Sequence, residues 1–327
     1  MGFKKNELTF ISVIIFGFLL FSLIGHMEER TQVVVREDTT SRVKKHAPVD
    51  SETFCVYLIT RDQVSNYWQQ IDIGCQKAVQ ELGNIDYHWT APTKNNVEDQ
   101  REVIQQAVND GAEAILLAAS SYTELNDVLD KATAAGIRLI YVDSPASHPA
   151  LAELVTDNVD AGRIAGRTML QALEEAGIKN GTIGLAAGSS NGKNATLRSQ
   201  GFREIFQGTG FTVAPTVAHD GNRENIEKEV INHPEYVGFF GANEQVTWII
   251  SEQVQASRRK PIIVGFDTSD FTLSMIQKGI IYATIQQNTE KMGYEGIMLA
   301  VASLRGESVG ADKKKDMGVN VITKNRL

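Results

Sequence analysis

The sequence PIIVGFDTS, residues Pro261–Ser269, is an apolar run that ends abruptly on an acid, Asp267. Its β-branched and apolar residues predict a strand covered on both faces, and such strands belong to parallel sheets flanked by helices. Ligands of open α/β sheets bind beyond the carboxyl ends of the strands, so Asp267 is placed to meet a small polar molecule. RLIYVDS, Arg138–Ser144, repeats the pattern and ends on Asp143. Two such strands predict one site built from two halves, although an aspartate at a strand end can also serve as a helix cap.

From Thr53 onward the chain alternates buried strands with amphipathic helices, which is the pattern of βαβ units. The predicted strands are 54–59, 85–90, 112–119, 138–143, 151–157, 181–188, 213–220, 237–243, 261–267 and 282–288. The predicted helices lie near 65–82, 97–110, 122–135, 161–176, 193–207, 223–232, 244–256 and 269–278. The sequence therefore predicts an α/β protein with two doubly wound parallel-sheet lobes and a ligand site in the cleft between them.

Length and composition exclude several functions. A chain of 327 residues with 42% hydrophobic and 22% charged residues predicts about two globular domains. The formal net charge of −8 argues against a nucleic-acid partner. Six histidines and two cysteines show no ligand spacing, so we expect neither a metal site nor a cofactor. The glycine-containing stretch Gly184–Lys193 lacks the Walker spacing, which argues against a nucleotide site.

The amino-terminal residues contain an apolar run, Leu8–Gly25, without a charge. About 18 such residues are enough for a membrane-spanning helix. Lys4 and Lys5 precede the run, and no A-x-A cleavage pattern or lipid-accepting cysteine follows it. We therefore expect residues 1–26 to form an uncleaved anchor, 27–52 to form a tether, and the remainder to lie outside the cytoplasm. The alternative is a signal peptide that is removed.

The polar residues near the predicted strand ends suit a sugar. Sugar hydroxyls donate and accept hydrogen bonds, so their sites use carboxylates, arginine, and asparagine or glutamine, together with aromatic rings for the apolar sugar faces. Tyr67 and Trp68 follow the first strand, and Asn243 and Gln287 lie at the ends of two later strands. The alternatives are core packing for the aromatic residues and a cap or turn role for the amides.

Several motifs in order along the chain carry a family resemblance: SNYW, YVDS, VTDNVDAGRIAG, RSQGFREIF, FFGANE, VGFDTS and YATIQQN. From about Thr53 to its end, the chain resembles the periplasmic sugar-binding proteins of the ribose, xylose and galactose type, which share their fold with the LacI-family repressors. This resemblance implies the following ligand-binding residues: Arg61, Tyr67, Trp68, Asp143, Asn194, Thr196, Asn243, Asp267 and Gln287.

Departures from the family pattern bear on the identity of the sugar. Ribose-type proteins carry an arginine directly after the first aspartate and another in the helix after the glycine-rich loop, where this chain has Ser144 and Thr196. The loss of two donors would leave sugar oxygens unpaired, unless Arg61 replaces one of them. Arg61 with the pair Trp68-Gln69 is more similar to the xylose-binding branch, which favours a pentose such as xylose.

The resemblance also implies an architecture with three hinge crossings, near Asp157, Gln287 and Asp316. Lobe one would comprise 53–157 and 288–316, and lobe two would comprise 158–287 and 317–327. The two lobes would close on a monosaccharide.

The chain looks similar to some anchored members of the family, which present the sugar signal to a membrane histidine kinase, so this resemblance implies a tethered receptor of a two-component system. The alternative is a substrate-binding protein that delivers sugar to an ABC permease. An enzyme would need an acid and base pair, for which Asp143 and Asp267 are the only candidates, and we expect none. A repressor would need a basic helix-turn-helix in place of the apolar run.

Cys55 and Cys75 allow two interpretations. An extracellular pair can form a disulfide, but Cys55 lies in an apolar strand and Cys75 in the first helix. We expect two buried thiols, because free cysteine behaves as a small hydrophobic residue.

Overall fold

The computed structural model describes residues 53–94, 96–190 and 192–327. The predicted anchor, residues 1–26, and the predicted tether, residues 27–52, lie outside these residues. Within the described ranges, no helix has the length and apolar character needed to span a membrane.

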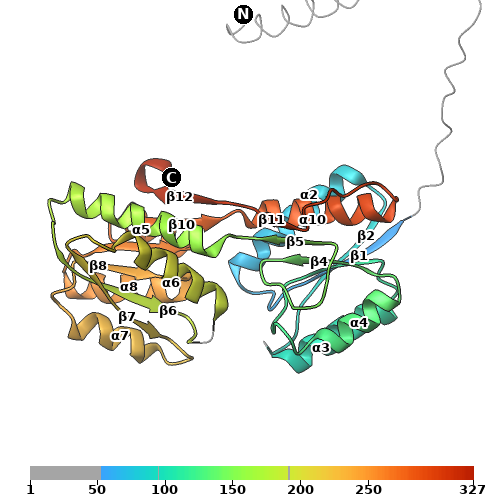
Figure 1. Cartoon of the computed structure of the whole chain (residues 1–327), viewed down its shortest axis with the longest axis horizontal. Coiled ribbons are helices and arrows are strands. Elements are labelled where there is room, and N and C mark those ends of the chain that lie inside the picture. Colours follow the sequence, from blue (N-terminus) through green and yellow to red (C-terminus); the bar gives the residue numbers. More distant parts are fainter. Residues whose placement is uncertain (1–52, 95, 191) are drawn as a thin grey trace, which may run out of the picture. The chain divides into compact units, whose positions relative to one another are not determined.

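Two six-stranded sheets with the same strand order form the framework of two lobes (Figure 1). The first sheet has the order β11-β5-β4-β3-β1-β2, and all of its pairs are parallel. The second has the order β12-β10-β9-β8-β6-β7, and only β12 runs antiparallel, against β10. The strands of the first sheet are β1 (Phe54–Ile59), β2 (Ile85–Thr90), β3 (Ala114–Leu117), β4 (Arg138–Val142), β5 (Ala152–Val155) and β11 (Lys314–Asp316). Those of the second are β6 (Gly181–Ala187), β7 (Phe211–Ala218), β8 (Gly238–Gly241), β9 (Ile262–Phe266), β10 (Ala283–Gln287) and β12 (Val319–Thr323).

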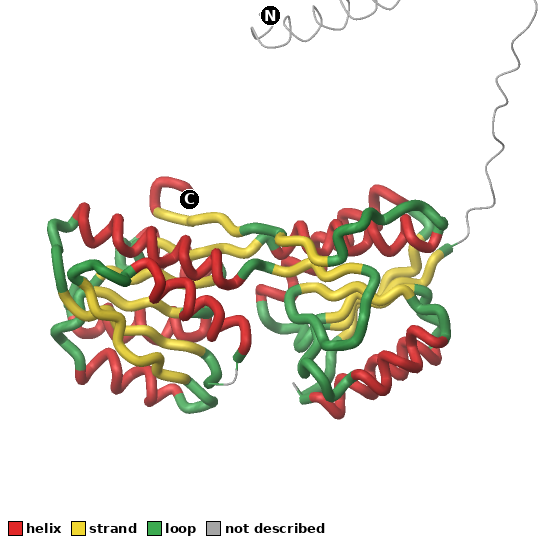
Figure 2. Tube along the Cα trace, viewed as in Figure 1, coloured by secondary structure: helices red, strands yellow, loops and turns green. Residues whose placement is uncertain are grey.

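Helices cover both faces of each sheet (Figure 2). In the first lobe, α2 and α10 pack on one face and α3 and α4 on the other. In the second lobe, α5 and α6 cover one face and α7, α8 and α9 the other. The helices are α2 (Asn66–Leu82), α3 (Val97–Asn109), α4 (Asn126–Ala134), α5 (Asn158–Glu175), α6 (Lys193–Ile205), α7 (Arg223–Asn232), α8 (Glu244–Ser257), α9 (Asp270–Gln277) and α10 (Thr289–Leu304), with a 3-10 turn at Lys324–Arg326. The predicted class, two α/β lobes with mainly parallel sheets, is confirmed.

The chain passes from one sheet to the other at three places: between β5 and α5, between β10 and α10, and between β11 and β12 (Figure 1). Each sheet therefore takes one strand, β11 or β12, from the last residues of the chain. Neither strand was predicted as an element, and α10 was not predicted either.

The two cysteines point to opposite faces of the first sheet. Cys75 is buried in the core between the sheet, α2 and α10, whereas Cys55 is half-buried against the core beneath α3 and α4. Both thiols are free, so the disulfide interpretation is wrong. The expected burial holds for Cys75 and only partly for Cys55.

Glycines bring one pair of helices in each lobe into backbone contact. A Cβ atom on Gly74 of α2 would lie 1.9 Å from the carbonyl oxygen of Glu290, and one on Gly293 of α10 would lie 1.9 Å from that of Ile71. In the second lobe, a Cβ atom on Gly201 of α6 would lie 1.9 Å from the carbonyl oxygen of Val159 in α5. Side chains at these positions would force the helices apart.

We therefore expect Gly201→Ala to lower the free energy of unfolding by about 1–3 kcal/mol, the usual cost of overpacking. Chemical denaturation of the purified chain measures it. Gln200→Ala is the matched control, because Gln200 is the exposed neighbour on the same helix, and it should change stability by less than about 0.5 kcal/mol. If the two substitutions have equal effects, the close contact of α5 with α6 does not limit stability.

Candidate functional site

Asp143 and Asp267 occupy equivalent places in the two sheets. Each directly follows its strand, β4 or β9, and each has a left-handed backbone, with φ of 62° and 66° respectively. The N–H of Asp143 donates to the carbonyl oxygen of Leu154 at 2.9 Å, and that of Asp267 donates to the carbonyl oxygen of Ile285 at 2.8 Å. Aspartate tolerates this conformation better than most residues, and such strained positions gather at functional sites.

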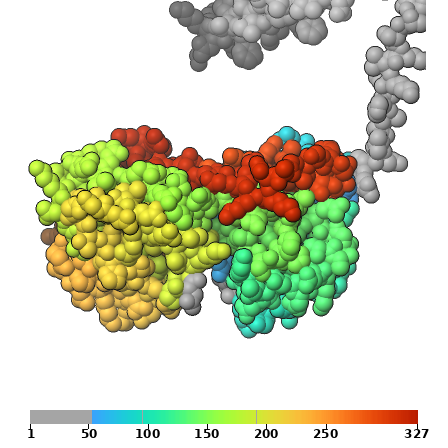
Figure 3. All heavy atoms as spheres, in the orientation of Figure 1, coloured from blue at the N-terminus to red at the C-terminus, as the bar shows by residue number. Residues whose placement is uncertain are grey.

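A cavity of about 1130 Å³ lies at these strand ends and is lined by residues of both lobes. Figure 3 shows the hollow between the two lobes on one face of the molecule. Eight of the nine predicted ligand residues line the cavity: Arg61, Tyr67, Trp68, Asp143, Asn194, Asn243, Asp267 and Gln287. Thr196 does not. It is exposed on α6, and its hydroxyl donates to the carbonyl oxygen of Gly192 at 3.0 Å.

On the first lobe, Asp143 is held by two hydroxyl groups. The Tyr67 hydroxyl donates to Asp143 Oδ1 at 2.7 Å, and the Ser144 hydroxyl donates to Oδ2. The ring of Trp68 meets the ring of Tyr67 edge-on at 4.8 Å, and its Nε1 donates to Asp62 Oδ2 at 3.2 Å. Trp68 is only 7% exposed and belongs to the hydrophobic core. It therefore both packs in the core and lines the cavity.

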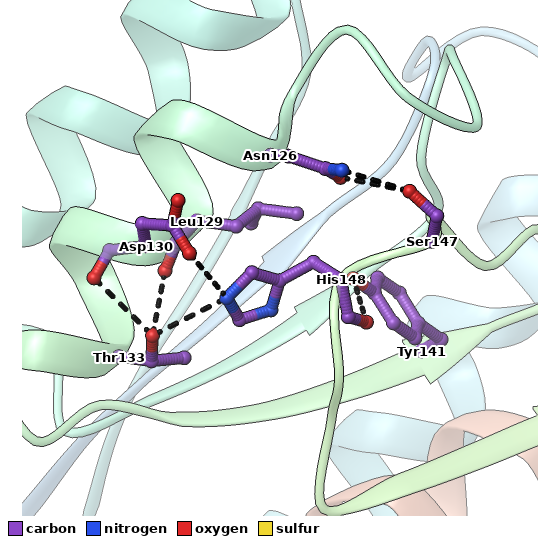
Figure 4. A network of polar contacts seen from close by, with 7 residues as sticks. All are labelled: Asn126, Leu129, Asp130, Thr133, Tyr141, Ser147 and His148. Atoms are coloured by element: carbon purple, nitrogen blue, oxygen red, sulfur yellow. Dashed lines mark hydrogen bonds and ion pairs between the residues drawn. The ribbon is translucent and has the colours of Figure 1, made fainter.

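The loop that follows Asp143 is fixed to α4 by a network of polar contacts (Figure 4). His148 Nε2 lies 3.2 Å from Asp130 Oδ1, and the Tyr141 hydroxyl donates to the carbonyl oxygen of His148 at 3.0 Å. Asn126 and Ser147 form a further bond between the helix and the loop. These contacts restrain the chain directly beyond Asp143.

On the second lobe, Gln287 donates from Nε2 to Asp267 Oδ1 at 2.8 Å. The pKa of Asp267 is raised to about 6. Burial is the largest cause, Arg198 and the hydrogen bond from Gln287 oppose the shift, and the carboxylates of Asp143 and Glu244 add to it. The charged form of Asp267 is therefore held at an energetic cost.

Arg198 lines the cavity and was missed by the sequence analysis. Its side chain is buried, with 4% of its surface exposed. Nε donates to Asn158 Oδ1 at 2.7 Å, and Nη1 donates to the carbonyl oxygen of Ala242 at 2.9 Å. The guanidinium carbon lies 3.7 Å from the centroid of the Phe266 ring. The chain therefore does carry an arginine in this helix, but two residues after Thr196, the position at which the family pattern has one. The sequence did contain a signal for it: Arg198 lies three residues after the apolar Ala195, and this spacing places both residues on the same face of the helix.

Four buried polar atoms without a hydrogen-bond partner belong to residues that line this cavity: Arg61 Nε, Ser120 Oγ, Thr156 Oγ1 and Gln287 Oε1. In the described part of the chain, the only other such side-chain atom is His148 Nδ1. An unpaired buried polar atom costs about 1–3 kcal/mol, so the concentration of four in one cavity indicates a polar ligand that pairs with both donors and acceptors.

The side-chain oxygen of Asn243 caps α8, because Oδ1 accepts from the N–H of Val246 at 3.1 Å. The cap interpretation therefore holds for its oxygen, while the residue also lines the cavity. Asn194 reaches the same cavity from the first turn of α6.

Comparison with known proteins agrees with this geometry. A family model described as a periplasmic binding protein domain matches residues 56–308. The chain belongs to this family. The expectation of a type I periplasmic binding protein fold is confirmed, and the chain is a binding protein rather than an enzyme.

The proteins to which this chain is similar include import binding proteins. The ribose import binding protein of Haemophilus influenzae is 25% identical over 75% of this chain and 84% of its own. The D-apiose import binding protein of Paraburkholderia graminis is 25% identical over 70% of this chain and 75% of its own. The solved structure of a carbohydrate transporter solute-binding protein from Agrobacterium radiobacter, in complex with D-arabinose, has a TM-score of 0.74 and 25% identity over 85% of this chain and 96% of its own.

The raised pKa of Asp267 predicts how stability depends on pH. A carboxyl group with a pKa of about 6, above its ordinary value of 3.8, favours the folded state when protonated, and this advantage is lost as the pH rises through about 6. Asp267→Asn keeps an acceptor for Gln287 and tolerates the left-handed backbone. It should stabilise the sugar-free chain by about 1–2 kcal/mol at about pH 7.5, and the gain should shrink below about pH 6.

Denaturant titrations of the parent chain and of Asp267→Asn at a series of pH values measure this difference. Asp270→Asn is the control, because Asp270 is exposed three residues further on. A gain that stays constant with pH, or that appears equally in the control, would contradict the buried charge at Asp267.

Proposed function

We propose that this chain is an extracytoplasmic receptor that binds a monosaccharide, with a pentose favoured, and delivers it to an ABC permease. The observation that carries the proposal is the cavity in which two aspartates, Arg198 and four unpaired polar atoms converge. Sugar hydroxyls supply donors for the carboxylates and acceptors for the guanidinium groups in one molecule. Two relatives are named for the import of ribose and apiose, and both names support a pentose.

The choice among pentoses stays open to experiment. Xylose was favoured on Arg61 and on the pair Trp68-Gln69, but Gln69 is exposed and donates to the carbonyl oxygen of Val64. Arg198 also brings a guanidinium group to the cavity, two residues after the position at which ribose-type proteins carry theirs, and this weakens the argument against ribose. Ribose and xylose are therefore the first two sugars to compare.

We assign lobe one to residues 53–157 and 288–316 and lobe two to 158–287 and 317–327, with the three crossings as hinges. Asp143 belongs to the first lobe and Asp267 to the second, so a sugar that bonds both binds a closed form more tightly than an open one.

Two side-chain contacts also join the lobes directly. Asn66 Nδ2 donates to the carbonyl oxygen of Thr268 at 2.9 Å, and Lys193 Nζ lies 4.6 Å from the centroid of the Tyr122 ring.

A thermal-shift screen of the purified chain against pentoses and hexoses tests sugar binding. A ligand that binds only the folded protein stabilises it by RT ln(1 + [L]/Kd), so a saturating pentose should raise the melting temperature by several degrees. Asp267→Ala should weaken binding of the responding sugar at least about 100-fold, because it removes two hydrogen bonds to a charged group. Asp270→Ala is the control and should bind as the parent does. The absence of a shift with every sugar would remove the proposal.

A second function, presentation of the sugar to a membrane histidine kinase, is favoured by the apolar run Leu8–Gly25, which suits a protein anchored in the membrane by a single span. Closure of the lobes changes the surface that a partner meets. A partner that prefers the closed form must tighten sugar binding by the same factor by which sugar tightens the partner.

Deletion of the gene, followed by assays of sugar uptake and of sugar-induced transcription, separates delivery from sensing. Delivery predicts that uptake falls, while transcription still responds to sugar that enters the cell by another route. Sensing predicts that induction is lost, and also that amino-terminal sequencing finds the chain still beginning at Met1 or Gly2 in membranes washed with high salt. A chain processed near Met27 would remove the anchored form.

A further inference from the structure

Three side chains with different ligand atoms meet on one face of β1 and β2 in the first lobe, two of them near the amino ends of these strands. The thiol of Cys55, a carboxylate oxygen of Asp86 and a ring nitrogen of His88 all lie within 4.8 Å of one another. The parallel register pairs Cys55 with Asp86 and Tyr57 with His88. Because alternate residues of a strand share a face, this register puts all of these side chains on the same side of the sheet.

We propose that Cys55, Asp86 and His88 form a zinc-binding site. Thiolate sulfur, imidazole nitrogen and carboxylate oxygen are the ligands that Zn²⁺ takes in proteins, and three protein ligands leave one position for water. Sequence spacing gave no sign of the site, because its ligands come from two strands about 30 residues apart that only the sheet register brings together.

The surroundings of Cys55 favour a cation. The carboxylate of Asp86 lies beside the thiol, Oε2 of Glu113 accepts from the N–H of Cys55 at 2.9 Å, and the carboxylate of Asp110 also interacts with the thiol. Asp110 is also the carboxyl-terminal cap of α3, and the carboxyl end of a helix carries partial negative charge. A zinc ion here offsets this negative potential and displaces the thiol proton to solvent.

The ring of His88 is already oriented for coordination. It stacks on the ring of Tyr57 at 4.7 Å, and its Nε2 lies 3.1 Å from Asp86 Oδ1. The Tyr57 hydroxyl in turn donates to Asp110 Oδ2 at 3.1 Å. Cys55 is a free thiol and is half-buried, so it is available as the third ligand.

The site has a structural role, separate from the cavity. β2 is the last strand of the first sheet, so a metal bridge from Cys55 to Asp86 and His88 ties this edge strand to its neighbour. The cavity lies beyond the carboxyl ends of the strands, whereas this site lies on one face of β1 and β2, with two of its three ligands near their amino ends. Zinc should therefore raise the melting temperature without changing sugar affinity.

Calorimetric titration of the full-length, chelator-treated chain with Zn²⁺ tests the proposal, and Co²⁺ serves as a spectroscopic probe. We expect one ion per chain, and a thiolate-to-cobalt absorption band in the ultraviolet. Loss of a residue that only supports a metal ligand weakens metal binding about 10–100-fold. Cys55→Ser and His88→Gln each remove a ligand itself, so each should weaken zinc binding by at least this factor. The cobalt band should vanish in Cys55→Ser.

His233→Gln is the matched control, because His233 also lies beside two carboxylates, those of Glu229 and Glu235, but has no thiol among them. It should bind zinc as the parent does. Unchanged affinity in Cys55→Ser and His88→Gln, or an equal loss in His233→Gln, would overturn the site. Either result leaves the sugar assay unaffected, so failure here is distinct from failure of the proposed function.

Discussion

The buried guanidinium of Arg198 holds together the parts of the second lobe that face the cavity. It bonds Asn158, the first residue of α5 after the first crossing, and the carbonyl oxygen of Ala242 at the end of β8, and it stacks on Phe266 directly before Asp267. Burial of a cation costs several kcal/mol unless it is paired and hydrogen-bonded. The start of α5, the end of β8 and the end of β9 therefore cannot move independently of α6.

Close packing of α5 on α6 makes this arrangement possible. A Cβ atom on Gly162 would lie 2.1 Å from the carbonyl oxygen of Arg198 itself, and one on Gly201 would lie 1.9 Å from that of Val159. Larger residues would move the backbone that carries Arg198 away from Asn158. The fold of the second lobe and its ligand site thus depend on the same two glycines, and the first lobe repeats the contact between α2 and α10 with Gly74 and Gly293.

The sequence allowed the strand ends to be predicted because a buried strand leaves a strong local pattern. Asp143 and Asp267 stood out as acids that end apolar runs, and both line the cavity. β11 was missed because its residues, Lys314–Asp316, are charged and exposed, and only pairing with the distant β5 makes them a strand. Thr196 was chosen by its place in a motif, whereas the burial of Arg198 depends on which face of α6 meets the sheet. The cluster at Cys55 depends on register, which no local pattern carries.

The charges in the cavity also constrain the chemistry of its ligand. The negative charges of Asp143 and Asp267 repel each other. Burial and this repulsion raise the pKa of Asp267 to about 6, although Arg198 opposes the shift. An anionic ligand would add a third negative charge to this group, and its desolvation would not be offset by the single buried arginine. An uncharged polyol brings no charge, and hydroxyl groups are able both to donate to carboxylates and to accept from guanidinium groups such as those of Arg198 and Arg61. The electrostatics of the site therefore favour neutral sugars over sugar acids and sugar phosphates, independently of which pentose or hexose fits its shape.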